Sequence, residues 1–110
     1  MTNYPVLQPN GLFAIWSTIV ESPTFLNCTV EDIVSELATR PGNAELLRGW
    51  CQQLKEGHLP REHWSKWDEA LACTMYHHGA GSEIAMQMLA ITPDTTETYR
   101  LLATWYEEEE

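Results

Sequence analysis

The sequence predicts a mainly α-helical protein, a compact bundle of four to five short helices with an N-terminal β-hairpin or extended arm. A chain of 110 residues has the length of one domain, and its 44% hydrophobic residues, five of them Trp, are enough for a core. From residue 29 onward, apolar residues recur at spacings of three and four between helix-capping residues. We expect one globular domain over 1–106, with the arm over 1–28, the helices over 29–106 and an acidic tail over 107–110.

The N-terminal part is predicted from a turn signal and a β-rich run. Pro9-Asn10-Gly11 separates two apolar stretches, and Asn and Gly tolerate the positive φ of tight turns. The run 12–20 is rich in β-branched residues, which favours a strand. Leu12 and Trp16 also lie at helical spacing, so periodicity alone leaves a helix open. We favour the strand and expect Ser22-Pro23 to end it.

Four of the five predicted helices begin at a residue that caps helices well, and most of the five are followed by a glycine or proline that ends them. The third has Pro60 in its first turn and continues to about His78, with Trp64 and Trp67 on its apolar face. The other four follow Thr29, Asn43, Ser82 and Asp94, and glycines at 57 and 79 are natural C-terminal stops.

The charge balance favours a basic protein as partner. The chain has sixteen Asp and Glu residues but six Lys and Arg residues, a net charge of −10. This negative charge repels nucleic acid and anionic membranes. No apolar run reaches the roughly 20 residues of a membrane helix, and the N-terminus lacks the pattern of a signal peptide. Three cysteines without a CxxC pair argue against a disulfide framework. We therefore expect a cytoplasmic protein with no direct contact to membrane or nucleic acid.

The segment that most resembles part of a metal or acid-base site is YHHGAG, residues 76–81. Adjacent helical residues point about 100° apart, so His77 and His78 do not easily share an ion, and Gly79 makes the segment a helix end. Cys73 and His77 are four residues apart on one face and offer two zinc ligands, whereas a structural zinc site needs four. No nucleophile elbow or phosphate-binding loop is present. We expect no enzyme, no cofactor and no metal.

The function favoured is that of a small acidic protein-binding module, an inhibitor that docks a basic, nucleic-acid-binding protein by electrostatic mimicry, of the kind phages use against host defence. Carboxylates would steer the partner and aromatic residues would anchor it. The alternatives are a metal-dependent enzyme or sensor using Cys73 and His77, with His58 or His63, and a self-associating homodimer. The Trp rings are also good candidates for the core. The candidate binding residues are Trp64, Trp67, Asp68, Glu69, Glu62, Glu31 and Asp32.

Overall fold

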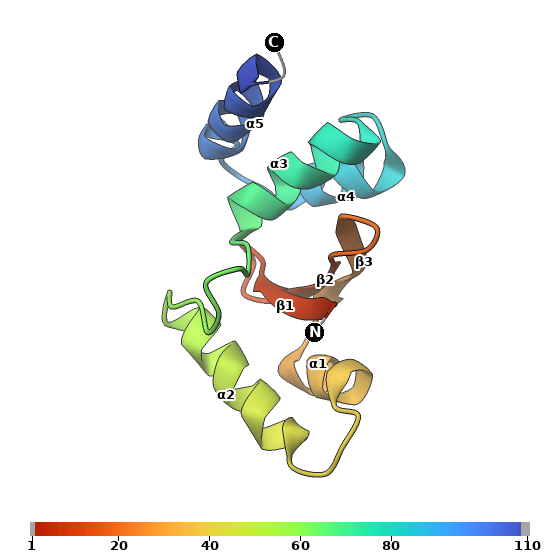
Figure 1. Ribbon diagram of the computed structural model, residues 1–110, viewed down its shortest axis with the longest axis vertical. Coiled ribbons are helices and arrows are strands. Elements are labelled where there is room, and N and C mark those ends of the chain that lie inside the picture. Colours follow the sequence, from red (N-terminus) through yellow and green to blue (C-terminus); the bar gives the residue numbers. More distant parts are fainter. Residues whose placement is uncertain (1, 109–110) are drawn as a thin grey trace.

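A computed structural model describes residues 2–108, and these form a sheet of three strands followed by five helices (Figure 1). The strands are β1 (Asn3–Leu7), β2 (Phe13–Ser17) and β3 (Ser22–Cys28). The helices are α1 (Val30–Leu37), α2 (Asn43–Lys55), α3 (Trp67–His78), α4 (Glu83–Ala90) and α5 (Thr96–Glu108). The chain is 50% helical and 16% strand, so the predicted mainly α bundle is wrong and the fold is mixed α/β.

The sheet lies between two layers of helices, which is why the helices do not form one bundle. Figure 1 shows α1 and α2 on one side of the sheet and α3 and α4 on the other. Side chains alternate along each strand. Tyr4, Val6 and Trp16 pack toward α3 and α4, whereas Phe13 and Ile15 pack toward α1 and α2. The central strand β2 is buried along its whole length because both faces are covered.

The strands form an antiparallel meander, in the order β1-β2-β3. The predicted strand over 12–20 is confirmed in its central part as β2, and the turn at Pro9-Asn10-Gly11 joins it to β1. The Gln8 side chain is buried and donates to the Asn10 and Asn27 side chains, which ties this turn to the end of β3.

The prediction that Ser22-Pro23 ends the β structure is wrong. These two residues begin β3, where Pro23 lies opposite Trp16. Because β3 is an edge strand, a missing backbone N–H is tolerated there. The loop between β2 and β3 ends at Glu21, whose φ is +56° and whose N–H donates to the Ser17 carbonyl at 2.9 Å.

Several helix boundaries follow the local rules. Thr29 caps α1 through a reciprocal capping box with Asp32, and the Ser82 side chain caps α4. Gly57 and Gly79 follow α2 and α3 with φ of +89° and +90°. Asn43, predicted as a cap, is instead the first residue of α2 and follows Gly42.

The third helix is shorter than predicted. It begins at Trp67 after Lys66, and residues 60–66 are irregular. Trp64 lies in that irregular segment and stacks on Tyr4, with ring centroids 5.0 Å apart. The Ser65 N–H donates to the Tyr4 hydroxyl at 3.0 Å. This long-range contact with β1 takes the place of a helical turn.

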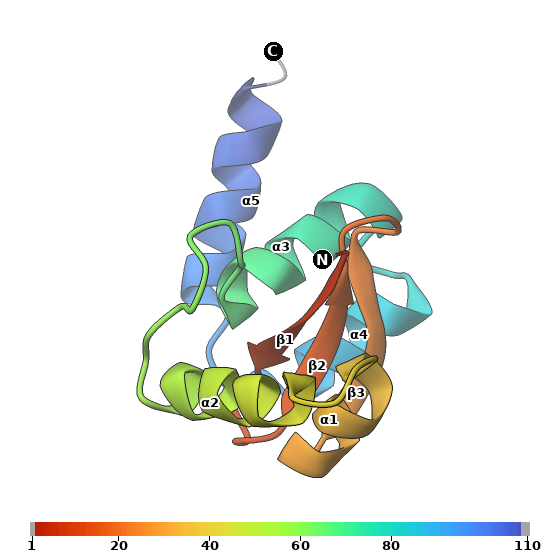
Figure 2. The same cartoon turned by 60° about the horizontal axis from the view of Figure 1, so that its bottom comes forward.

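The last helix, α5, packs mainly against α3 and buries Thr98 and Leu102 there. It projects from the rest of the molecule (Figure 2). The whole molecule, α5 included, extends 47 Å along its longest axis and 25 Å along each of the other two. Of the predicted acidic tail, Glu107 and Glu108 continue α5, and Glu109 and Glu110 lie outside the described residues. No helix within residues 2–108 has the length and apolar character needed to cross a membrane.

Candidate functional site

The two tryptophans expected to anchor a partner are buried. Trp64 is 3% exposed and Trp67 is 7% exposed, and both belong to the core between the sheet and α3. The Trp67 indole N–H donates to the Thr92 hydroxyl at 2.9 Å. In this structure the rings fill the core, which is the alternative that the sequence also allowed.

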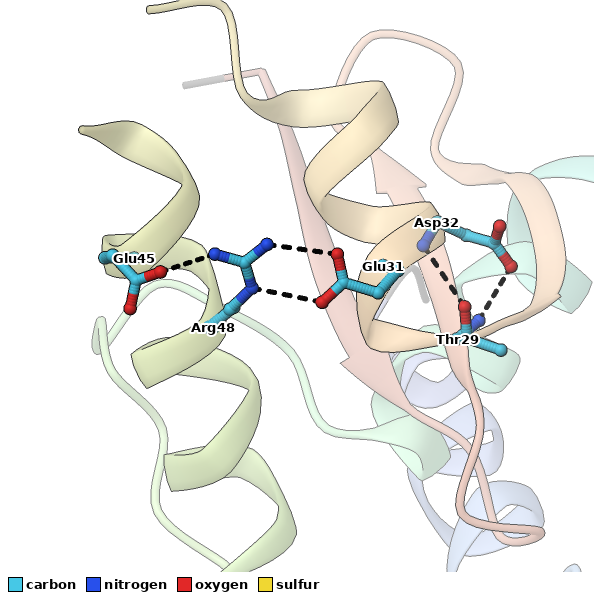
Figure 3. Close-up of polar contacts among 5 residues, drawn as sticks. All are labelled: Thr29, Glu31, Asp32, Glu45 and Arg48. Carbon is cyan, nitrogen blue, oxygen red and sulfur yellow. Dashed lines mark hydrogen bonds and ion pairs between the residues drawn. The ribbon is translucent and has the colours of Figure 1, made fainter. Parts of the chain in front are cut away.

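Two of the candidate acidic residues have structural partners within the molecule (Figure 3). Glu31 accepts two hydrogen bonds from Arg48, at 3.0 and 3.1 Å, and these bonds lower the pKa of its carboxyl. The Arg48–Glu31 pair links α2 to α1, and Arg48 also pairs with Glu45 one turn earlier in α2. Asp32 accepts from the Thr29 N–H at 2.9 Å in the capping box. These two carboxylates therefore have structural roles in the fold, and both remain exposed.

The remaining acidic candidates lie before and within the first turn of α3. Glu62 and Glu69 are exposed, while Asp68 is partly buried and accepts from the Thr98 hydroxyl at 3.1 Å. Asp68 thereby joins the start of α3 to α5. The structure does not gather the three carboxylates and the two tryptophans into one exposed surface.

An aromatic cluster that was not predicted lies where the C-terminal halves of α3 and α5 meet. Tyr76 makes an edge contact with Trp105, with ring centroids 5.9 Å apart, and lies 5.2 Å from the Tyr106 ring. Tyr106 is 49% exposed. A pocket of about 330 Å³ lies beside these rings and is lined by Cys73, Tyr76, His77, Trp105 and Glu108. Only the fold brings α3 and α5 together, so no local sequence signal could have identified this surface.

The second cluster lies where the β2–β3 loop docks on α3. Glu21 Oε2 lies 2.6 Å from His77 Nε2 and accepts a hydrogen bond from the Cys73 thiol at 3.4 Å. The three donor atoms all lie within 4.8 Å of one another. His78 Nε2 also lies 2.6 Å from the Val20 carbonyl oxygen and holds the same loop. The Cys73–His77 spacing was visible in the sequence, but Glu21 was not, because it lies more than 50 residues earlier.

The environment of Cys73 is that of an unreactive thiol. Burial, followed by the hydrogen bond to Glu21 and the charge of that carboxylate, raises its pKa to about 12. A catalytic cysteine instead needs a pKa lowered toward neutrality, because the thiolate is the nucleophile. Burial also raises the pKa of Cys51, to about 11, and that of Cys28. A raised pKa disfavours the thiolate form that nucleophilic catalysis needs at each of these three cysteines.

Cys73, His77 and Glu21 are the residues among 2–108 whose side chains could hold a metal ion together. The other histidines predicted as possible ligands, His58 and His63, are exposed and lie outside this cluster. Comparison of the chain with known protein families, curated proteins and solved structures gave no match.

Proposed function

We propose that this protein is a small acidic protein-binding module that docks a basic segment of another protein through the C-terminal half of α5. The observation that carries this proposal is the aromatic cluster of Tyr76, Trp105 and Tyr106, on a chain with a net charge of −10. Tyrosine and tryptophan are the residues most often found as binding hot spots, and they attract Arg and Lys through their ring faces.

The distribution of charge supports the same end of the molecule. Glu107 and Glu108 occupy the last turn of α5, where the helix dipole also places partial negative charge. That helix projects from the body, so these charges lie at a protruding end (Figure 2). Carboxylates beside exposed rings suit a guanidinium group, which pairs with carboxylates and stacks on aromatic rings.

The partner class follows from this chemistry. A basic surface that fits an acidic, aromatic helix end is typical of proteins that bind nucleic acid, and occupying it would inhibit that binding by mimicry. We further propose a cytoplasmic location, in keeping with three free cysteines that form no disulfide within the described chain.

The test is capture of partners from a lysate of the source cell by the full-length chain at low and moderate salt, followed by binding measurements with the purified partner. We expect a basic partner that is released as salt rises and is displaced by nucleic acid. Tyr106→Ala should weaken binding about fivefold or more, since truncating an important interface residue costs about 1 kcal/mol or more.

The matched control is Phe25→Ala on β3, a residue that is 51% exposed but remote in the fold from the α5 surface. Equal loss in the two variants, or binding that is insensitive to salt, would refute the proposed surface. A chain that captures only itself, with a dimer mass by light scattering, would replace the proposal by the homodimer alternative.

A further inference from the structure

We propose that Glu21, Cys73 and His77 form a zinc-binding site with three protein ligands and an open fourth position. This inference goes beyond the proposed protein-binding function and does not depend on it. It also departs from the expectation, drawn from the sequence, that the chain binds no metal.

The donor set matches the chemistry of zinc. Zn²⁺ binds thiolate sulfur, imidazole nitrogen and carboxylate oxygen, and the cluster supplies one of each. Mg²⁺ and Ca²⁺ prefer all-oxygen ligands, so the sulfur and nitrogen donors disfavour them. Sites with three protein ligands leave one position for water or another ligand, unlike closed structural sites with four.

The three ligand atoms lie within 4.8 Å of one another, and two of their separations can be compared with a tetrahedral zinc site. Zinc–ligand bonds of about 2.0 to 2.3 Å place neighbouring ligand atoms roughly 3.3 to 3.6 Å apart. The Cys73 Sγ to Glu21 Oε2 distance is 3.4 Å and already fits. The His77 Nε2 to Glu21 Oε2 distance is 2.6 Å, so the imidazole and carboxylate need to separate by about 0.7 Å. Both side chains are 44% exposed, which leaves them room to do so.

The backbone around the cluster is held independently of those side chains. Cys73 and His77 are one helical turn apart on α3, so the helix fixes their relative position. The loop that carries Glu21 is held by the hydrogen bond from the Glu21 backbone N–H to the Ser17 carbonyl. The contact between the His78 ring and the Val20 carbonyl holds it as well. Zinc would replace the hydrogen bonds to Glu21. The thiol proton is released to solvent as the sulfur binds, and the proton that His77 Nε2 shares with Glu21 moves to Nδ1, because zinc binds a neutral imidazole through a free lone pair.

The open position has a route to solvent. Cys73 and His77 line the pocket that also contains Trp105 and Glu108. Water, or an electron-pair donor from a ligand, could reach the ion from that side. A purely structural role, in which Glu21 only tethers the loop to α3, explains the same hydrogen bonds equally well. That role predicts no affinity for metal, so a metal-binding experiment distinguishes the two explanations.

The experiment uses the full-length chain without a histidine tag, purified under reducing conditions and stripped with a chelator. Zinc chloride is titrated against a chromophoric chelator, and bound zinc is counted by mass spectrometry after dialysis. We expect one zinc per chain. Cobalt chloride should give the thiolate charge-transfer absorption that shows direct coordination by sulfur.

Cys73→Ser and His77→Gln should each weaken zinc binding by about 100-fold, since even indirect partners of metal ligands are worth 10- to 100-fold. The matched controls Cys28→Ala and His58→Gln should leave the affinity within about twofold. Glu21→Gln, at a partly exposed loop residue, should weaken binding about tenfold and serves as the test if Cys73→Ser fails to fold.

Three outcomes overturn the proposal: less than one zinc per chain at saturating metal, full affinity in both Cys73→Ser and His77→Gln, or loss of binding in His58→Gln. Partner capture by the zinc-free chain reports on the protein-binding function separately, so the failure of either proposal is distinguishable from the failure of the other.

Discussion

We expect Cys51 to lower the stability of this protein at alkaline pH, by an amount that follows from the burial of its thiol. The side chain has no exposed surface and packs with Phe13, Ile33 and Leu47 between the sheet and α2. Burial raises its pKa from an ordinary 9.0 to about 11, although nearby Lys55 acts in the opposite direction. The unfolded chain therefore loses the thiol proton at a pH where the folded chain keeps it.

The sign and magnitude follow from proton linkage. Between pH 9 and 11 the folded state binds more protons at this site than the unfolded state, so the free energy of unfolding decreases as pH rises. The contribution is fully present below pH 9. By pH 10, about one pKa unit into the window, the loss is about 1.3 kcal/mol.

The assay is urea unfolding of the full chain and of Cys51→Ala at pH 8 and pH 10, with reductant present. The variant loses packing at both pH values, so the informative quantity is the change in unfolding free energy between them. The other ionisable groups are the same in the two proteins, so their contributions cancel in this comparison. We expect the pH-dependent loss to be smaller by about 1.3 kcal/mol in Cys51→Ala. An equal loss in both proteins would refute a folded-state pKa raised by burial.

Three further substitutions test individual contacts by the same unfolding measurement. Thr29→Ala removes the capping box of α1 and should cost about 1 kcal/mol, whereas Thr39→Ala, exposed and outside the helices, should cost almost nothing. Leu71→Ala removes most of a fully buried α3 side chain and should lower the free energy of unfolding by about 3 kcal/mol. A similar loss in Leu46→Ala, where the side chain is half-exposed, would contradict the assigned core. Tyr4→Phe leaves the Ser65 N–H without its acceptor and should cost about 1 kcal/mol, while Tyr106→Phe at the exposed end of α5 should be neutral.

The features predicted correctly from sequence are those set by residues close together in the chain. The cap at Thr29 and the glycine after α3 depend on neighbours within a few residues. The third strand was missed because Ser22-Pro23 is an ordinary stop signal, and only its place at the sheet edge makes Pro23 acceptable.

The errors about α3 and the site have a common cause in long-range contacts. Trp64 has helical spacing with Trp67, yet its ring stacks on Tyr4, and that contact keeps residues 60–66 out of the helix. In the same way, Cys73 and His77 were recognisable as a pair, but the loop residue that completes the cluster is brought to them only by the docking of the sheet on α3.

Zinc and a basic partner should oppose one another on this protein, because the two proposed sites share a wall. Cys73 and His77 line the pocket beside Trp105 and Glu108, at the edge of the aromatic cluster on α5. Binding of Zn²⁺ with release of the thiol proton adds one net positive charge there. That charge reduces the attraction for a cationic side chain.

The coupling must be reciprocal, so the partner should lower the affinity for zinc by the same factor that zinc lowers the affinity for the partner. We expect a factor of about 5 or more, the lower end of typical coupling between sites. Partner binding measured with and without saturating zinc gives one factor, and zinc titration with and without the partner gives the other. In Cys73→Ser both factors should fall to about one. Unequal factors in the unaltered protein would mean that zinc binds elsewhere or that the partner itself takes up the metal.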